Sequence, residues 1–288
     1  MKVTGYTRLA GLIANPAKHS ISPLMHNAAF KANGIDAVYL SFEVEKAQLE
    51  ASLRSITALD MIGVNVSMPY KMAVIPYLNE LSAAAQLIGA VNTIVPTHDG
   101  ALVGHNTDGS GFMRSLADID VDIIGKEITI IGAGGAATAI CVQAALDGVK
   151  KINIFNRQDN FFIQSRKKIQ TIAQKTQCEI HLHDLADTKV VNNAISRSSL
   201  LVNATGVGMK PNEDRTAITD FSAFHQKLAV YDVVYNPRKT KLLQIAKEKG
   251  LKHTNGLGML LYQGADAFEL WTGQKMPLET IKPLVENS

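Results

Sequence analysis

Short apolar runs and amphipathic segments alternate along the chain, and this pattern predicts its secondary structure. Runs rich in β-branched residues predict buried strands, and apolar positions three or four residues apart predict helices that cover a sheet. In the first part of the chain, helices are expected at 23–34, at 45–59 and up to about residue 87, with Ser22 capping the first of them. Strands are expected at 7–14, 37–44 and 61–66, before a hairpin of 91–95 and 101–104. This order predicts a mixed sheet.

The second part of the chain alternates strands and helices more regularly. A helix over 108–116 leads into it, and two helices over 257–272 and 277–286 follow it. Such alternation is typical of a doubly wound parallel sheet. The strands expected in this sheet are 128–131, 151–155, 179–183, 200–203 and 229–234.

A glycine-rich stretch from Lys126 to Leu146, KEITIIGAGGAATAICVQAAL, organises this second part. Gly132, Gly134 and Ala137 have the G-x-G-x-x-G/A spacing, and they lie between a predicted strand and a predicted helix. Such a turn lets the backbone approach a pyrophosphate, which the helix N-terminus then binds. The alternative is a purely structural turn. The glycines and the flanking charges argue against a membrane span.

Composition narrows the class of protein. The length of 288 residues favours two domains, and a net charge of +3 without a basic arm argues against nucleic acid as a partner. The N-terminus lacks the apolar segment of a signal peptide. Cys141 and Cys178 lie inside predicted elements and suggest no disulfide framework. A cytoplasmic protein without a membrane partner is expected.

Nine segments form a recognisable series: HSISP (19–23), NVSMPYK (65–71), GAVNTIV (89–95), HNTDGSGF (105–112), GAGGAA (132–137), NRQD (156–159), NATGVGMKP (203–211), VVYNP (233–237) and GLGMLLYQGADAFELWTG (256–273). In this order they resemble the shikimate dehydrogenase family, most closely its quinate/shikimate, NAD-accepting branch. The resemblance implies an α/β fold of two domains with an active-site cleft between them. An N-terminal mixed-sheet substrate domain would span 1–108 plus 257–288, and a Rossmann doubly wound nucleotide domain would span 109–256.

The family pattern identifies Lys71 and Asp108 as the catalytic pair. Without that pattern, a solvated lysine and a helix N-cap are the favoured interpretations of the two residues. Oxidation of an alcohol needs a base for the hydroxyl proton, and reduction needs the matching acid. Asp108 would orient Lys71 and bind a substrate hydroxyl. The sequence leaves open whether Lys71 transfers the proton or polarises the oxygen.

The resemblance also implies the residues of the substrate site. Two serines of HSISP would bind a carboxylate, and amide and hydroxyl groups would bind the ring hydroxyls. Turn, core and capping roles are the alternatives for several of these residues. Ser67 replaces the threonine of the shikimate-specific pattern, which leaves room for the bulkier quinate. The residues assigned to substrate are Ser20, Ser22, Tyr39, Ser67, Asn92, Thr107 and Gln263.

The cofactor is expected to be NAD, with NADP also accepted. Asp159 lies in NRQD, where the adenosine ribose is expected, and a carboxylate accepts hydrogen bonds from a 2′-OH but repels a 2′-phosphate. Helix capping is the alternative role for Asp159. His181 and His183 have no evident third partner, so no metal is expected. The residues assigned to cofactor are Gly132, Ala133, Gly134, Gly135, Ala136, Asn156, Arg157, Asp159, Val233, Tyr235 and Gly256.

The hypothesis is an oxidoreductase of aromatic amino acid biosynthesis. It would transfer hydride reversibly between NAD(P) and a ring hydroxyl of shikimate or quinate, forming 3-dehydroshikimate or 3-dehydroquinate. Its partner would be this small polyol carboxylate, and its assembly a monomer or homodimer. An inactive NAD(P)-binding regulator is an alternative that the presence of Lys71 and Asp108 disfavours. A dehydrogenase of a modified shikimate-like ring is another.

Overall fold

Each half of the chain builds its own sheet, as the hydrophobic pattern predicts, and each sheet has six strands, one more than expected. The computed structural model describes residues 3–159 and 162–287. The chain divides into one unit of Met1–Gly111 with Leu261–Ser288 and another of Phe112–Leu260. The divisions expected from the sequence, after residues 108 and 256, lie at the starts of two helices, α4 (Asp108–Ala117) and α9 (Leu257–Thr272).

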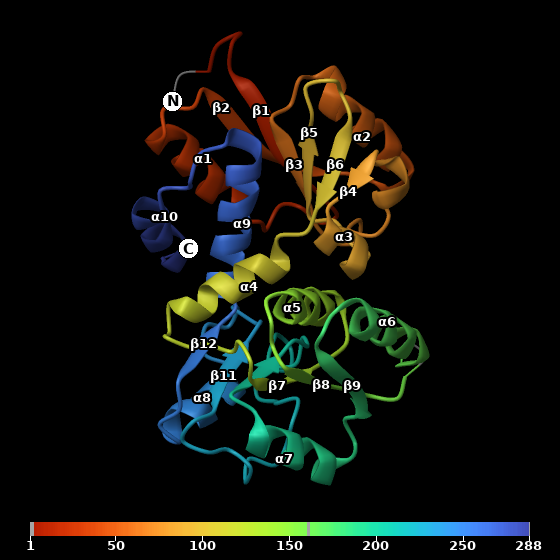
Figure 1. Ribbon diagram of the computed structural model, residues 1–288. Coiled ribbons are helices and arrows are strands. Elements are labelled where there is room, and N and C mark those ends of the chain that lie inside the picture. The colour runs from red at the N-terminus through yellow and green to blue at the C-terminus, as the bar shows by residue number, and fades with distance from the viewer. Residues whose placement is uncertain (1–2, 160–161, 288) are drawn as a thin grey trace. The chain divides into compact units, whose positions relative to one another are not determined.

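The sheet of the first unit is mixed and has the strand order β2-β1-β3-β5-β6-β4 (Figure 1). Strand β1 pairs in parallel with β2 and β3, whereas β5 runs antiparallel to both β3 and β6. The predicted hairpin is therefore confirmed as β5 and β6. The strands are β1 (Arg8–Ala14), β2 (Ala37–Glu43), β3 (Gly63–Val66), β4 (Glu80–Leu81), β5 (Thr93–Pro96) and β6 (Leu102–His105).

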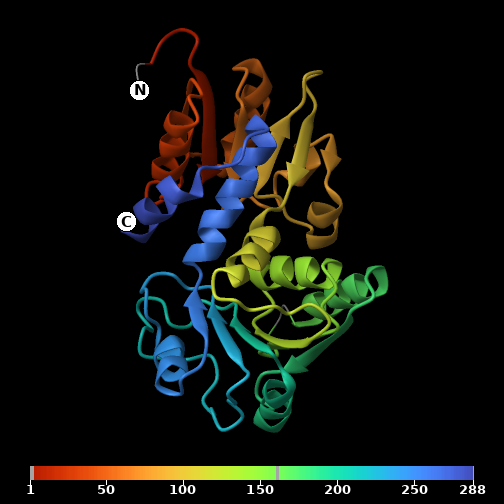
Figure 2. The ribbon, with the colours of Figure 1, turned by 60° about the vertical axis from the view of Figure 1, so that its left-hand side comes forward.

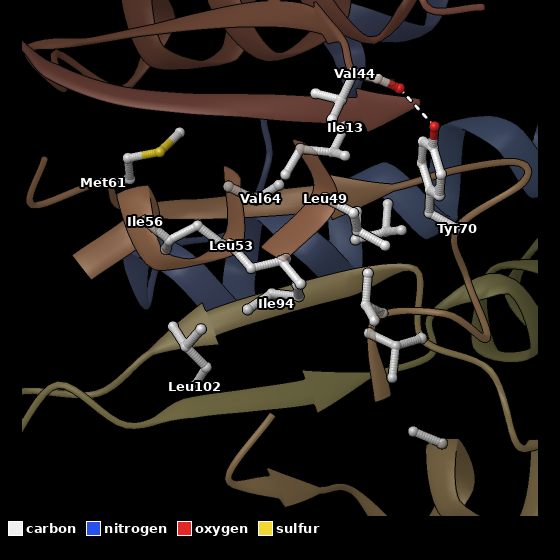
Figure 3. Packing of buried hydrophobic residues seen from close by; sticks show 14 residues of the cluster. Ile13, Val44, Leu49, Leu53, Ile56, Met61, Val64, Tyr70, Ile94 and Leu102 are labelled. Carbon is white, nitrogen blue, oxygen red and sulfur yellow. Dashed lines mark hydrogen bonds between the residues drawn. The ribbon is translucent and has the colours of Figure 1, made fainter. Parts of the chain in front are cut away.

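Amphipathic helices cover this sheet. Leu49, Leu53 and Ile56, spaced one helical turn apart, pack on Ile13, Val64 and other core residues of the sheet (Figure 3). Successive side chains of β3 face opposite sides of the sheet, so Gly63 and Val64 lie on different faces. Gly63 packs against the indole ring of Trp271 in α9. The helices are α1 (Ser22–Ala32), α2 (Leu49–Ala58), α3 (Ala83–Ile88), α9 (Leu257–Thr272) and α10 (Leu278–Glu286), with 3₁₀ turns at Lys46–Gln48 and Ile75–Tyr77.

The sheet of the second unit is parallel throughout, with the order β12-β11-β10-β7-β8-β9 (Figure 2). Chain order reverses between β7 and β10, which makes the carboxyl ends of these strands the topological switch point. The strands are β7 (Glu127–Ile131), β8 (Lys151–Asn156), β9 (Glu179–Asp184), β10 (Leu200–Asn203), β11 (Ala229–Asp232) and β12 (His253–Asn255). The helices are α5 (Gly135–Leu146), α6 (Phe162–Lys175), α7 (Thr188–Arg197) and α8 (Lys241–Glu248), and α4 (Asp108–Ala117) leads into the unit.

Four local expectations need correction. Residue 21 already has helical backbone angles, so Ile21 and not Ser22 is the N-cap of α1. The segment before residue 87 contains the short strand β4 as well as helix, because Glu80 and Leu81 pair with β6. Residues 45–59 are a 3₁₀ turn followed by a shorter helix. The short strand β12 was not expected, since its residues are polar and only half-buried.

The apolar stretch after the glycine turn forms α5, whose twelve residues are mostly buried. A helix this short is far from the length of about 20 residues needed to span a bilayer. Across 3–159 and 162–287, no helix combines the length and apolarity of a membrane span. The apolar character of α5 is instead explained by its burial within the second unit.

Candidate active site

Predicted site residues from distant parts of the chain gather at one edge of the first sheet. Lys71 follows β3, and Asp108 follows β6. Asn92 immediately precedes β5, which runs in the opposite direction to its two neighbours. The carboxyl ends of β3 and β6 and the amino end of β5 therefore lie at the same edge, the edge at which open α/β sheets bind ligands.

The chain between β3 and Lys71 is held by its own backbone and by Tyr70. The Tyr70 side chain is buried and donates a hydrogen bond to the carbonyl of Val44 at 2.5 Å (Figure 3). The Lys71 carbonyl accepts from the amide of Val91 at 2.7 Å. These contacts fix both sides of the Lys71 backbone, so that the core packing of this unit determines where the lysine side chain begins.

Lys71 and Asp108 form a close ion pair. The Lys71 Nζ donates to Asp108 Oδ2 at 2.6 Å, and the two side chains are 29% and 15% exposed. The other carboxylate oxygen, Oδ1, accepts from Asn92 Nδ2 at 2.9 Å. A lysine ammonium has three N–H donors, so the amine can contact Asp108 and still donate to a ligand. The pair is exposed enough for a small molecule to reach it. It is also shielded enough from water that its electrostatic interactions are stronger than those of a fully solvated pair.

Asn92 is the centre of this arrangement. Its side chain is 2% exposed, and its Oδ1 accepts from the backbone amide of Thr107 at 2.9 Å. Its Nδ2 lies 3.0 Å from Thr107 Oγ1 and 3.4 Å from Gln263 Oε1, besides the contact to Asp108. An amide has only two N–H donors, so these three acceptors compete for them. A ligand hydroxyl that donates to one of these acceptors would relieve the competition.

Tyr39 contacts this network from inside the core. Its hydroxyl donates to Asn65 Oδ1 at 2.8 Å and also hydrogen-bonds the Ser22 side chain. Burial raises the pKa of the Tyr39 phenol, so the hydroxyl stays neutral and remains a donor. The ring stacks on His26 at 4.5 Å between centroids. Because the ring is fully buried, Tyr39 meets the site through Ser22 and Asn65.

The two serines of HSISP lie in the turn that enters α1. The Ser20 hydroxyl accepts a hydrogen bond from the Ser22 amide at 3.2 Å, and within the described chain no side chain caps α1. Ser22 is 9% exposed, and Ser20 is more accessible. Ser67, directly after β3, is also half-buried. Its amide donates to the Ile13 carbonyl at 3.0 Å, which fixes it at the carboxyl end of β1.

The glycine turn of the second unit has the geometry of a phosphate cradle. Gly132 has φ of +104°, and a side chain there would meet Thr205 at 2.9 Å, so internal packing requires this glycine. Among the described residues, nothing lies within 4 Å of a Cβ built at Gly134 or Gly135. Internal packing therefore leaves this space open. Such open space is what a ligand would need to approach the backbone closely.

The start of α5 completes the cradle. Gly134 is its N-cap, and within the described chain no side chain caps the helix and its first turn holds no acidic residue. The first N–H groups of a helix otherwise lack partners and favour an anion. Ala133 and Ala136 are half-buried beside these glycines. The residues present thus fit a pyrophosphate.

The residues assigned to the ribose and to the other end of the cofactor lie at the carboxyl ends of β8, β11 and β12. Asn156 ends β8, and its Nδ2 donates to the Arg157 carbonyl at 3.1 Å. Arg157 and Asp159 are exposed. Val233 and Tyr235 follow β11, and Tyr235 is 39% exposed. A Cβ built on Gly256 would lie 2.0 Å from the Val233 carbonyl oxygen, so these two backbones are in direct contact.

Comparisons with known proteins identify the family of this chain. Residues 12–94 match the family model of the shikimate dehydrogenase substrate binding domain, and residues 256–286 match that of the shikimate 5'-dehydrogenase C-terminal domain. The chain is 51% identical over 284 residues to shikimate dehydrogenase (NADP(+)) of Listeria monocytogenes serotype 4b, covering 99% of this chain and 97% of the relative. The chain belongs to the shikimate dehydrogenase family.

Two solved structures resemble this shikimate dehydrogenase family member along its whole length. Shikimate 5-dehydrogenase from Listeria monocytogenes, in complex with shikimate and NAD, has a TM-score of 0.96 at 51% identity and covers 99% of this chain and 98% of that chain. Quinate dehydrogenase from Corynebacterium glutamicum, in complex with NAD, has a TM-score of 0.87 at 30% identity, with 98% and 99% covered. The two-domain α/β fold expected from the sequence is confirmed.

Two buried polar residues of this family member were missed by the sequence analysis. Asn65 Nδ2 donates to the Asn92 carbonyl and to Thr93 Oγ1, both at 3.2 Å. Thr93 Oγ1 in turn donates to Asn92 Oδ1 at 3.0 Å. The two residues thus connect Tyr39 to Asn92 through the interior. The available signal was an asparagine inside an otherwise apolar strand, because buried amides need partners.

The two histidines considered for a metal lie on β9. His181 is 5.9 Å from His183 between ring centroids and contacts Glu179 Oε1 at 2.6 Å. The Glu179 carboxylate also contacts Lys151 at 2.9 Å, and these two partners lower the pKa of Glu179 to about 2. In the residues that the structure describes, no group of three or more potential ligands is arranged to hold a metal ion.

Proposed function

We propose that the protein is an NAD(P)-dependent shikimate dehydrogenase that also accepts quinate. It would transfer hydride reversibly between the cofactor and a ring hydroxyl, forming 3-dehydroshikimate or 3-dehydroquinate. The observation that carries this proposal is the Lys71–Asp108 ion pair, fixed by Asn92 at the carboxyl edge of the first sheet. A lysine and a carboxylate held together after β3 and β6 can bind one hydroxyl and move its proton.

Lys71 is proposed to hold the proton at the reacting oxygen. During reduction of the ketone, its Nζ donates a proton to the developing alkoxide, and during oxidation it takes the proton back. Asp108 orients the amine through the 2.6 Å contact and accepts a second hydrogen bond from substrate. When bound, the nicotinamide ring supplies or accepts the hydride. Asn92 keeps the Asp108 carboxylate oriented in either direction of reaction.

The first unit is proposed to bind the acid and the ring hydroxyls, within the substrate domain 1–108 plus 257–288. Ser20 and Ser22, on the turn into α1, would donate to the carboxylate, which the helix N-terminus also favours. Asn92, Thr107 and Gln263 provide amide and hydroxyl groups for the ring hydroxyls. Tyr39 would act through the Ser22 hydroxyl that it contacts.

The second unit is proposed to hold the cofactor, within the nucleotide domain 109–256. The backbone at Ala133–Ala136 and the N-terminus of α5 would bind the pyrophosphate. Asn156, Arg157 and Asp159 would contact the adenosine end of the cofactor. The backbones of Val233, Tyr235 and Gly256 would contact the nicotinamide end. The open space at Gly134 and Gly135 supports this assignment.

NAD is proposed as the preferred cofactor, with NADP also used. The relatives at 51% identity are named for NADP(+), whereas the similar Listeria structure contains NAD. The proposal rests on Asp159, an exposed carboxylate near the end of β8 that repels a 2′-phosphate. Arg157 favours a 2′-phosphate, and its presence explains why NADP is expected to be used as well.

A matrix of initial rates tests these proposals together. Shikimate and quinate are each crossed with NAD⁺ and NADP⁺, and reduced nicotinamide is followed by its ultraviolet absorbance. Shikimate turnover with either cofactor supports the function, and its absence with both overturns it. The ratio of kcat/KM for NAD⁺ to that for NADP⁺ should fall in Asp159→Ala. An unchanged ratio, or a strong preference of the wild type for NADP⁺, would overturn the cofactor proposal.

The proposed partner is the small polyol acid alone, and the proposed assembly is a monomer or homodimer. Both cysteines are free and buried. Burial raises the pKa of Cys178 to about 11, which keeps this thiol protonated and unreactive at neutral pH. Unpaired thiols fit a reducing compartment, and we therefore infer a cytoplasmic enzyme. Light scattering of the purified protein would measure the assembly directly.

A further inference from the structure

A fully buried carboxylate lies at the carboxyl end of β11 in the second unit. Asp232 is 0% exposed, and burial raises its pKa. Three donors surround it: Asn203 Nδ2 at 2.9 Å and the Val234 amide at 3.1 Å reach Oδ1, and Thr240 Oγ1 at 2.6 Å reaches Oδ2. These bonds come from a neighbouring strand, from the loop after β11 and from the N-cap of α8. One side chain therefore joins three segments.

The segment that Asp232 fixes most directly is the backbone of Val233. The Val233 amide donates to the Asn203 carbonyl at 2.9 Å, and the next amide, of Val234, donates to Asp232 itself. The Val233 carbonyl lies against Gly256, where a Cβ would approach it to 2.0 Å. The peptide groups on both sides of Val233 are thus fixed by these contacts. The half-buried Val233 side chain and the exposed Tyr235 therefore extend from a fixed backbone.

The same network reaches the glycine turn. Asn203, which donates to Asp232, accepts from the Thr205 hydroxyl at 2.7 Å and from the Thr205 amide at 3.2 Å through its Oδ1. The Thr205 methyl group packs on Gly132, where a Cβ would lie 2.9 Å from it. Asp232 thus reaches the turn after β7 only indirectly, through Asn203 and Thr205, whereas the Val234 amide contacts Asp232 directly.

A fold does not need such a group for stability alone. Burial of a carboxylate is costly, and apolar residues of similar volume often replace buried charged groups without loss of stability. A carboxylate instead fixes the relative positions of several segments, because its two oxygens accept strong hydrogen bonds from donors on each of them. The carboxyl ends of β10 and β11 are also close to the switch point, where small differences in backbone position affect ligand binding.

We propose that Asp232 is a positioning residue that sets the Val233–Tyr235 backbone for the nicotinamide end of the cofactor. This inference rests on the function proposed above and deepens it. Asp232 has no access to a ligand and acts through the peptide groups that it holds. The adenosine end, at Asn156–Asp159, follows β8 and belongs to a different part of the unit. Loss of Asp232 should therefore weaken the contacts to the nicotinamide more than those to the adenosine.

The test uses Asp232→Asn in the full-length protein, since the amide keeps the size but replaces an acceptor with a donor. We expect the KM for the nicotinamide cofactor to rise about tenfold or more, the effect of losing roughly one charged hydrogen bond. The KM for shikimate, and the affinity for ADP-ribose measured by calorimetry, should change by less than about threefold. ADP-ribose carries the pyrophosphate and adenosine but no nicotinamide. Its affinity therefore reports on the adenosine end of the site without a contribution from the nicotinamide end.

A matched control distinguishes positioning from general destabilisation. Ser198→Ala removes a buried hydroxyl that contacts Thr129 Oγ1 at 2.8 Å, at the opposite end of β10. It should lower the melting temperature and leave both cofactor constants unchanged. If Asp232→Asn does not fold, Thr240→Val removes one donor to Asp232, and Thr240→Ser restores that donor. The valine variant should raise the cofactor KM, and the serine variant should recover the wild-type value.

The inference is overturned if the folded variants keep the wild-type cofactor KM, or if ADP-ribose affinity falls as much as cofactor affinity. Failure of the proposed function has a different signature. The wild type would then oxidise neither shikimate nor quinate. Calorimetric titration with NADPH and ADP-ribose would still show whether Asp232→Asn selectively loses affinity for the nicotinamide-bearing ligand.

Discussion

Replacement of Lys71 by methionine tests the proposed chemistry most directly. Lys71→Met keeps most of the apolar stem and removes only the amine, which lies 2.6 Å from Asp108 Oδ2. Asp108 retains its contact with Asn92 Nδ2 at 2.9 Å, so its carboxylate is not left without a donor. The site should therefore stay folded while it loses the group that moves the proton.

The expected loss of rate is much larger than the loss of stability. Removal of a general acid–base group typically costs about 10²–10⁴-fold in kcat, or roughly 2.7–5.4 kcal/mol in the barrier. The two side chains are 29% and 15% exposed, between a surface pair and a buried pair. The stability cost should accordingly lie between the ~1 kcal/mol of exposed pairs and the ~3–5 kcal/mol of broken buried ones.

Initial rates of shikimate oxidation at saturating cofactor measure kcat, and urea denaturation measures stability. Lys18→Met serves as the control, because Lys18 is exposed and lies 3.8 Å from Glu43 in a comparable but solvated pair. The control should keep its kcat and lose little stability. If Lys71→Met keeps kcat within a few-fold of the wild type while remaining folded, Lys71 does not transfer the proton and the proposed mechanism is wrong.

Three further variants test the substrate site and the core. Ser20→Ala should raise the KM for shikimate more than that for its methyl ester; equal changes would remove the carboxylate role. Ser67→Thr adds a methyl group and should shift kcat/KM toward shikimate over quinate by about 1–3 kcal/mol. Gly63→Ala places a Cβ 2.1 Å from the Trp271 indole, which donates to the Ile94 carbonyl at 3.0 Å. It should lower the free energy of unfolding by about 1–3 kcal/mol, and an unchanged urea midpoint would contradict this packing.

Local sequence pattern was sufficient for the two sheets and for most of their strands. Buried β-branched runs such as 128–131 have few alternatives, because an apolar strand between two helices needs cover on both faces. The glycine turn was equally predictable from the sequence, because the positive φ of Gly132 favours glycine. The ends of elements were less certain. Ile21 replaced Ser22 as N-cap because the helical backbone begins one residue earlier than the side-chain preference suggests.

Polar and short strands carried too little local signal. The two residues of β4 and the half-buried β12 are defined by pairing with β6 and β11, which lie elsewhere in the sequence. Their backbone hydrogen bonds depend on partners that only the folded sheet provides. The pattern of apolar residues within each segment holds no information about such partners.

The family resemblance identified Lys71 and Asp108 as a pair, and the tertiary structure brings their side chains into contact. They are 37 residues apart, and only the antiparallel insertion of β5 between β3 and β6 places their strand ends at the same edge. The interior connection from Tyr39 through Asn65 to Asn92, and the anchoring of Val233 by Asp232, were beyond the sequence for the same reason. Hydrogen bonds between distant segments depend on where tertiary packing places buried donors and acceptors, whereas the sequence alone shows only that such groups need partners.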